Sequence, residues 1–235
     1  MKNLNFKGCV DNPKSKIGED IFGMNKYIKG LCNFIRQCPT PTTISIQGDW
    51  GSGKTSFMQM IDNELKNEVY SIWINTWQFS QFNLGDTLPI MVLTKLVDTL
   101  SVKDKFENEA KRAVLNIAKV GVDLMAAKGP SLSGVDVNGA VDRLIVGISY
   151  ENVTASISKL KKHFQDCVDD CLKRNGEKNR VVIFVDDLDR INPAKAVELL
   201  EVLKLFLDCE KCVFVLAMDY EVVLRGIDQK YEGKL

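Results

Sequence analysis

A glycine-rich loop between a predicted strand and a predicted helix is the feature that most restricts how this chain can fold. Residues 43–46 (Thr-Ile-Ser-Ile) are typical of a strand. Beyond the loop, apolar residues recur at helical spacing, which predicts a helix that begins near Lys54. The loop fits the pattern Gly, four residues, Gly-Lys-Thr: Gly48, Asp49, Trp50, Gly51, Ser52, Gly53, Lys54 and Thr55. This order of strand, loop and helix indicates a phosphate-binding site.

The residue types of the loop suit a nucleoside triphosphate. Its glycines let backbone N–H groups turn towards phosphate oxygens, and the helix that follows adds the positive end of its dipole. We expect Lys54 to reach the β- and γ-phosphates, Thr55 to bind Mg²⁺ and Ser56 to contact the α-phosphate. Residues 48–56 are therefore the predicted nucleotide-binding segment.

A second motif is a buried strand that ends in carboxylates. Residues 181–185 are five consecutive apolar residues, and Asp186 and Asp187 follow them, about 130 residues after the loop. We expect Asp186 to bind Mg²⁺ opposite Thr55, and Asp187 to act as the general base for the attacking water. Lys54 and Asp187 are thus the predicted catalytic residues, and Thr55 and Asp186 the predicted metal ligands.

Several other residues near these motifs have two interpretations each. Asn75 and Gln78 follow a predicted strand over 69–75, where they would either contact water or phosphate or cap a loop. Arg190 would act as an arginine finger on a neighbouring subunit or, as we prefer, pair with Asp187, Asp189 or another nearby acid. Within the segment 18–23, Ile21 and Phe22 would either cover the nucleotide base or pack on the core.

The rest of the chain shows a strand–helix alternation with one interruption. Helices are predicted over 24–37, from Asp86 or Thr87 onwards, over about five turns from Val153, and from Pro193 with Asn192 as its cap. A further buried strand is predicted over 212–217, followed by one short helix. Residues 101–150 fit neither pattern, and we expect a helical insertion or subdomain there within a single domain over 1–235.

Composition restricts the function classes. The chain has 31 basic and 31 acidic residues, which argues against a basic nucleic-acid surface over the whole chain. No apolar run approaches the roughly 18 residues of a membrane-spanning helix, and no secretory signal is visible. Seven cysteines at scattered spacing favour a reduced, cytoplasmic protein. Cys209 and Cys212, or His163, Cys167 and Cys171, do not form an obvious zinc set.

Four motifs together resemble the KAP family of P-loop NTPases. They are Asp-Trp-Gly-Ser-Gly-Lys-Thr at 49–55 (Walker A), Trp-Ile-Asn-Thr-Trp-Gln-Phe at 73–79, Asp-Asp-Leu-Asp-Arg at 186–190 (Walker B) and Val-Phe-Val-Leu-Ala-Met-Asp at 213–219. The resemblance implies an α/β fold with a parallel sheet of order 5-1-4-3-2, flanked by helices, and a polar sensor at Asp219. Family members continue well beyond this position whereas this chain ends at Leu235, so the presence of the fifth strand stays open.

The motifs and the resemblance predict an ATPase that uses Mg²⁺ and converts ATP to ADP and phosphate, to drive conformational change or assembly with a protein partner or with itself. The alternative is a nucleotide-dependent switch or scaffold with negligible turnover, because many hydrolysing relatives carry Glu where this chain has Asp187. Bacterial family members linked to phage exclusion make antiviral defence the implied process. A small-molecule kinase or a GTPase is less favoured, since neither an arginine-rich lid nor Asn-Lys-x-Asp is apparent.

Overall fold

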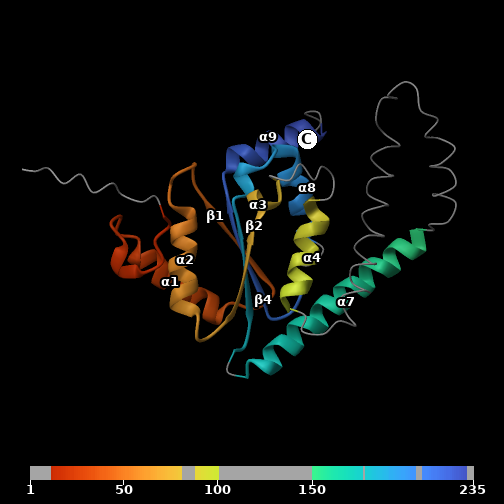
Figure 1. Cartoon of the computed structure of the whole chain (residues 1–235), viewed down its shortest axis with the longest axis horizontal. Helices are drawn as coiled ribbons and strands as arrows, with labels where there is room; N and C mark the ends of the chain where they lie inside the picture. The colour runs from red at the N-terminus through yellow and green to blue at the C-terminus, as the bar shows by residue number, and fades with distance from the viewer. Residues whose placement is uncertain (1–11, 81–87, 101–149, 177, 205–207, 232–235) are drawn as a thin grey trace, which may run out of the picture.

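The computed structural model describes residues 12–80, 88–100, 150–176, 178–204 and 208–231. Within these ranges, helices and parallel strands alternate along the chain (Figure 1). The elements are η1 (Ile17–Glu19), α1 (Asn25–Gln37), β1 (Thr42–Gln47), α2 (Lys54–Leu65), β2 (Tyr70–Asn75), α3 (Thr76–Ser80), α4 (Leu88–Leu100), α7 (Tyr150–Arg174), β3 (Val181–Asp186), η3 (Leu188–Arg190), α8 (Pro193–Leu203), β4 (Cys212–Met218) and α9 (Tyr220–Tyr231).

The four strands form one parallel sheet of order β1-β4-β3-β2. This arrangement confirms the predicted α/β fold and agrees with the 1-4-3-2 part of the predicted order. Every residue of the two central strands, β3 and β4, is buried, which explains their unbroken apolar runs. In β1 partly buried residues alternate with exposed ones. The sheet is therefore fully buried beneath Asp186, the last residue of β3, and Asp187, which follows it.

Helices cover both faces of the sheet in a three-layer arrangement (Figure 1). On one face, α1 and α2 pack buried residues such as Ile28 and Met58 against Val182, Phe184 and other residues of β3 and β4. On the opposite face, α4, α7 and α8 pack against the alternate side chains of the same strands. Because successive side chains of a strand point to opposite faces, each central strand contributes to both cores.

The predicted helices are confirmed with two differences. The helix α7 begins at Tyr150, three residues before the first residue of the predicted pattern, and has 25 residues instead of about five turns. The short helix α3 occupies residues where only a loop was considered. Asn192 accepts a hydrogen bond from the backbone N–H of Ala194 and Pro193 opens α8, as predicted. The predicted caps Asp86 and Thr87, and residues 101–149 of the predicted insertion, lie outside the described residues.

The helices α8 and α9 approach each other closely at Gly226. A Cβ atom placed on Gly226 would lie 2.2 Å from the carbonyl oxygen of Pro193 and 2.8 Å from Cγ2 of Val197. On the other side of the molecule, the Arg174 side chain donates a hydrogen bond from Nη2 to the carbonyl oxygen of Leu100 at 2.9 Å, which joins the C-terminal ends of α7 and α4. These two contacts join the outer helices in pairs, α8 with α9 and α4 with α7.

Candidate functional site

The glycine-rich loop lies between β1 and α2, at the carboxyl edge of the sheet. Gly53 is the N-cap of α2 and has φ of 91°, a left-handed conformation that favours glycine. The backbone N–H of Gly48 donates to the carbonyl oxygen of Met218 at 3.3 Å, so the start of the loop is anchored to the end of β4. Asp49 and Trp50 are exposed, and Trp50 has 79% of its surface accessible.

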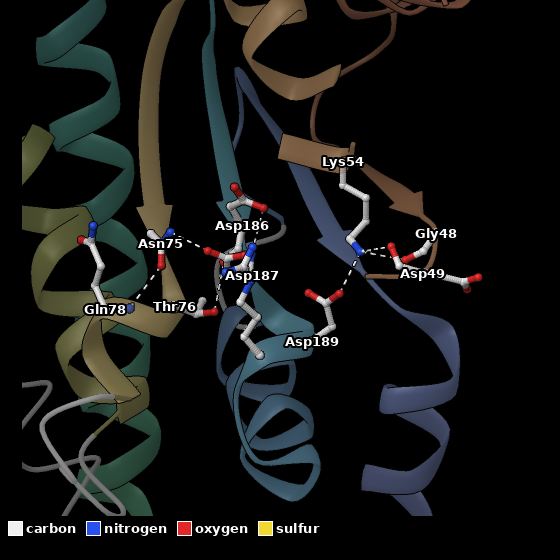
Figure 2. A network of polar contacts seen from close by, with 10 residues as sticks. Gly48, Asp49, Lys54, Asn75, Thr76, Gln78, Asp186, Asp187 and Asp189 are labelled. Atoms are coloured by element: carbon white, nitrogen blue, oxygen red, sulfur yellow. Dashed lines mark hydrogen bonds and ion pairs between the residues drawn. The ribbon is translucent and has the colours of Figure 1, made fainter. Parts of the chain in front are cut away.

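Lys54 extends along the inside of the loop and has three acceptors for its ammonium group. Nζ lies 2.7 Å from the carbonyl oxygen of Gly48, 3.1 Å from that of Asp49 and 2.8 Å from Oδ2 of Asp189. The side chains of Lys54 and Asp189 are only 9% and 6% exposed. Figure 2 shows the three acceptors converging on the end of Lys54. The sequence analysis did not identify Asp189 as a partner of Lys54.

Asp186 is the last residue of β3 and is almost fully buried, with 3% of its surface exposed. Its Oδ1 accepts a hydrogen bond from the backbone N–H of Asp187 at 2.9 Å. Burial raises the pKa of the Asp186 carboxyl above its usual value, while a hydrogen bond with Thr55 acts in the opposite direction. The structure thus brings together Thr55 and Asp186, the two predicted metal ligands.

Asp187 is held on both of its carboxylate oxygens. Oδ1 lies 2.5 Å from Nε of Arg190, and Oδ2 accepts a hydrogen bond from Nδ2 of Asn75 at 2.7 Å. Its backbone φ is 61°, a left-handed conformation that is uncommon outside glycine and often found at functional sites. The first of the two interpretations of Arg190 is therefore not the arrangement seen here: Arg190 pairs with an acid of its own chain.

Asn75 caps the segment that follows it, which is one of its two interpretations, while its contact with water or phosphate stays a prediction. Its Nδ2 contacts the site through Asp187, and its Oδ1 accepts a hydrogen bond from the backbone N–H of Gln78 at 3.1 Å, at the start of α3. The Gln78 side chain points away from Asp187 (Figure 2). Beside Asn75, the Thr76 hydroxyl donates to the carbonyl oxygen of Asp186 at 3.0 Å. The β2–α3 junction therefore positions the carboxyl end of β3.

Arg190 also contacts two tryptophans and lines a cavity next to the loop. Its guanidinium carbon lies 5.8 Å from the ring centroid of Trp50 and 5.7 Å from that of Trp77, which are cation–π distances. The cavity has a volume of about 480 Å³ and is lined by Trp50, Trp77, Asp189, Arg190, Asp219, Val222 and Arg225. Asp219, the predicted sensor, accepts a hydrogen bond from the backbone N–H of Glu221 at 2.9 Å.

A larger, mainly apolar cavity of about 790 Å³ lies on the other side of the loop. Ile21 and Phe22 line it and are 85% and 80% exposed, so the interpretation that they pack on the core is wrong. Ser56 also lines this cavity, and its Oγ accepts a hydrogen bond from the backbone N–H of Lys14 at 3.1 Å. The other lining residues come from α1, β1, α2 and the loop, including Tyr27, Ile44, Ile46, Ser52, Gly53, Lys54 and Phe57.

Among the described residues, no group of three or more His, Cys, Asp and Glu side chains is arranged to hold a metal ion. Burial raises the pKa of Cys209 to about 12. In the same described ranges, no helix combines the length and the apolar character that crossing a membrane requires.

Two comparisons relate the chain to known proteins. The family model described as "KAP family P-loop domain" matches residues 24–235, essentially the whole chain. The uncharacterized protein MJ0182 of the archaeon Methanocaldococcus jannaschii is 28% identical over 172 residues, which cover 60% of this chain and 86% of the archaeal protein. The family match agrees with the resemblance found in the four motifs and with the parallel sheet.

Proposed function

Because the chain belongs to the KAP family of P-loop NTPases, it is a nucleotide-binding domain, and we propose that it binds ATP and hydrolyses it to ADP and phosphate with Mg²⁺. The observation that carries this proposal is the position of Lys54 opposite the carboxylates that follow β3. Its ammonium group already contacts an anionic oxygen of Asp189 at 2.8 Å. A phosphate oxygen at that place would receive the same charge-assisted hydrogen bond.

The donor set near the loop suits Mg²⁺. The ion prefers oxygen ligands, and the Thr55 hydroxyl and the Asp186 carboxylate are in hydrogen-bond contact. Burial disfavours an isolated ionised Asp186, so a cation beside it would compensate its charge. In this proposal Thr55 and Asp186 hold the metal, which would neutralise charge on the phosphates.

Asp187 is the proposed general base. Asn75 and Arg190 hold its two oxygens and fix its orientation next to the metal ligand Asp186. Phosphoryl transfer depends mainly on positioning and on charge stabilisation, so a well-oriented carboxylate and Lys54 provide the main protein contributions. The large apolar cavity beside Gly53 and Ser56 supports a ligand that carries a nucleoside rather than a bare phosphate.

A nucleotide-dependent switch with negligible turnover is the second candidate. The observation that favours it is the engagement of Asp187 by both Arg190 and Asn75, since a base with two partners has less freedom to accept a proton. Under either candidate the nucleotide drives a change that a protein partner or a second copy of the chain detects. Defence against phage is proposed on family analogy alone.

The decisive experiment measures phosphate release from Mg-ATP by the wild type, Lys54→Ala and Asp187→Asn, together with thermal melting. We expect Asp187→Asn to bind ATP and lose hydrolysis, and Lys54→Ala to lose both. At ligand a hundred-fold above its dissociation constant, binding alone stabilises the fold by about 2.7 kcal/mol.

The outcomes separate the two candidates. Stabilisation of the wild type without phosphate release would favour the switch. Release that persists at the wild-type rate in Asp187→Asn would remove Asp187 from the mechanism. If ATP produces neither release nor stabilisation, the loop is not a working nucleotide site and the proposal fails.

A further inference from the structure

The turn η3 carries two neighbouring charged residues, and each of them holds one of the two proposed catalytic groups. Asp189 receives a hydrogen bond from Nζ of Lys54 at 2.8 Å. Arg190 pairs with Oδ1 of Asp187 at 2.5 Å. Since η3 spans only Leu188–Arg190, a movement of one of these side chains with its backbone displaces the other. Figure 2 shows Asp189 facing Lys54, with Asp187 nearby.

We propose that Asp189 occupies the place on Lys54 that a phosphate group of the nucleotide takes, and that its displacement shifts η3 and withdraws Arg190 from Asp187. Asp189 is then a competitor of the nucleotide, and Arg190 is a positioning residue that restrains the general base until phosphate arrives. This inference rests on the proposed nucleotide binding and adds a regulation of the same site.

The hydrogen bonds of Lys54 explain why a phosphate oxygen must displace an acceptor that is already bound to Nζ. An ammonium group has three N–H donors, and its three acceptors are the carbonyls of Gly48 and Asp49 and the carboxylate of Asp189. A phosphate oxygen that approaches Nζ must replace one of them. Asp189 is the anionic acceptor of the three, so the negative phosphate repels it while attracting the backbone N–H groups of the loop.

Asp189 needs another partner once it leaves Lys54, because a buried carboxylate without one is costly. Asp189 and Arg225 line the same cavity of about 480 Å³. For Arg225, the described part of the chain records one hydrogen bond, from Nε to the carbonyl oxygen of Glu221 at 3.3 Å, and no ion pair. The guanidinium of Arg225, on α9, is therefore the partner that the cavity offers to the displaced Asp189.

Because of the position of Arg190, its withdrawal from Asp187 should be detectable in the tryptophan emission. Its guanidinium lies against the rings of Trp50 and Trp77, so its withdrawal changes the surroundings of both indoles. The third tryptophan, Trp73, is stacked on Phe184 at 4.7 Å and donates to Asp62. Its contribution to the emission is expected to stay constant.

The affinity test uses the full chain and the non-hydrolysable analogue β,γ-imido-ATP with Mg²⁺, followed by calorimetry. Asp189→Asn should bind the analogue more tightly than wild type, by about five-fold or more, the lower end of typical coupling between sites. A substitution that merely damages the fold would weaken binding. Tighter binding therefore indicates loss of the competing carboxylate, and weaker binding indicates damage to the fold. Asp208→Asn is the matched control, because it removes the carboxylate partner of another lysine, Lys161, outside the site. We expect it to change affinity by less than about two-fold.

The results separate the exchange from the underlying function. Unchanged or weaker binding in Asp189→Asn, with binding abolished in Lys54→Ala, overturns the exchange and leaves nucleotide binding intact. Equal tightening in Asp208→Asn also overturns it, since a general charge effect would then suffice. Wild-type affinity in Lys54→Ala would instead refute the proposed function itself.

The coupling to Arg190 is tested by tryptophan emission of samples prepared without nucleotide. In Asp189→Asn, the emission spectrum should move towards that of the wild type saturated with the analogue, because η3 is already released. In Asp208→Asn it should match the wild type without nucleotide. An Asp189→Asn spectrum identical to that of the unliganded wild type would overturn the coupling.

Discussion

At the scale of single residues, the two adjacent carboxylates after β3 have contrasting surroundings. Asp186 is almost fully buried and hydrogen-bonded to neutral groups, the backbone N–H of Asp187 and Thr55. Asp187 instead pairs with the cation of Arg190 and accepts from Asn75. The first carboxylate is therefore a local source of instability, while the second contributes to the stability of the fold.

We expect Asp186→Asn to raise the melting temperature at neutral pH in samples without nucleotide. Burial raises the pKa of this carboxyl in the folded protein, so its ionised form is less favourable there than in the unfolded chain. The destabilisation is absent below the unfolded pKa, grows as pH rises from the unfolded pKa to the folded pKa, and is complete above it. A neutral Asn can still accept a hydrogen bond from the backbone N–H of Asp187. We expect the rise in melting temperature to be accompanied by a loss of Mg²⁺-dependent nucleotide binding.

Asp187→Asn is the matched comparison, because it removes a charge one position away but breaks an ion pair. It should lower the melting temperature. Calorimetric scans at pH 7 check whether the melting temperature rises for Asp186→Asn and falls for Asp187→Asn. A lower melting temperature for Asp186→Asn would show that the Asp186 carboxylate stabilises the fold.

At the scale of elements, the contact between α8 and α9 depends on Gly226, which has no side chain. A Cβ atom on Gly226 would meet the fixed backbone of Pro193, which begins α8 just after the carboxylate turn. The packing of α9 is thereby connected to the position of η3. The same geometry also brings Arg225 to the cavity that Asp189 lines.

Gly226→Ala should destabilise the protein by about 1–3 kcal/mol, because the helices must separate to admit the methyl group. Gly30→Ala is the control, and we expect it to change the stability in the opposite direction. Gly30 is an exposed glycine within α1 whose added Cβ meets no atom within 4 Å, so alanine should stabilise by about 0.5–1 kcal/mol. Urea unfolding of both variants measures the difference, and equal effects would contradict the close approach.

At the scale of the whole molecule, the site lies between two cavities that different parts of the chain create. The smaller one adjoins η3 and the start of α9, and the larger one is lined by the segment before α1 and by α1, β1 and α2. Lys54 lines the larger cavity, and it reaches the smaller cavity through its contact with Asp189. A ligand bound by the loop can therefore extend to opposite sides, with its phosphates towards β3 and its base towards Phe22.

We expect Phe22→Ala to weaken the binding of ATP while leaving the binding of inorganic tripolyphosphate unchanged. Stacking of a base on an aromatic ring contributes about 1–3 kcal/mol, and tripolyphosphate has no base. Phe34→Ala serves as the control, since Phe34 is a half-exposed aromatic of α1 that does not line the cavity. Competition titrations with both ligands give the comparison, and a parallel loss for both would place Phe22 outside the base site.

The sequence predicted the strands and the loop well because their signals are local. Continuous apolar runs mark β3 and β4, and the glycine pattern marks the loop whatever the rest of the chain does. The start of α7 was missed, since its first residues, Tyr150, Glu151 and Asn152, lack the apolar periodicity. The sheet order followed from the family resemblance, not from periodicity.

The contacts within the site were harder to predict for a physical reason. The ion pair between Lys54 and Asp189 joins residues 135 positions apart, and it depends on the turn that η3 makes after β3. The motif predicted that Arg190 pairs with a neighbouring acid, but it did not distinguish Asp187 from Asp189. Periodicity carries no information on which of two adjacent carboxylates faces the loop.

The long helix α7 gives the molecule a mechanical property. Its 25 residues make a rod of about 37 Å, which is joined to the rest of the molecule between Lys161 and Arg174 and extends past the sheet towards Tyr150 (Figure 1). The stretch from Lys161 to Tyr150 is about 16 Å long, so a tilt of about 5° at Lys161 moves the end of the helix by about 1.4 Å. Any small rearrangement of the layer beneath α7 would therefore arrive, enlarged, at the point where the chain enters this helix.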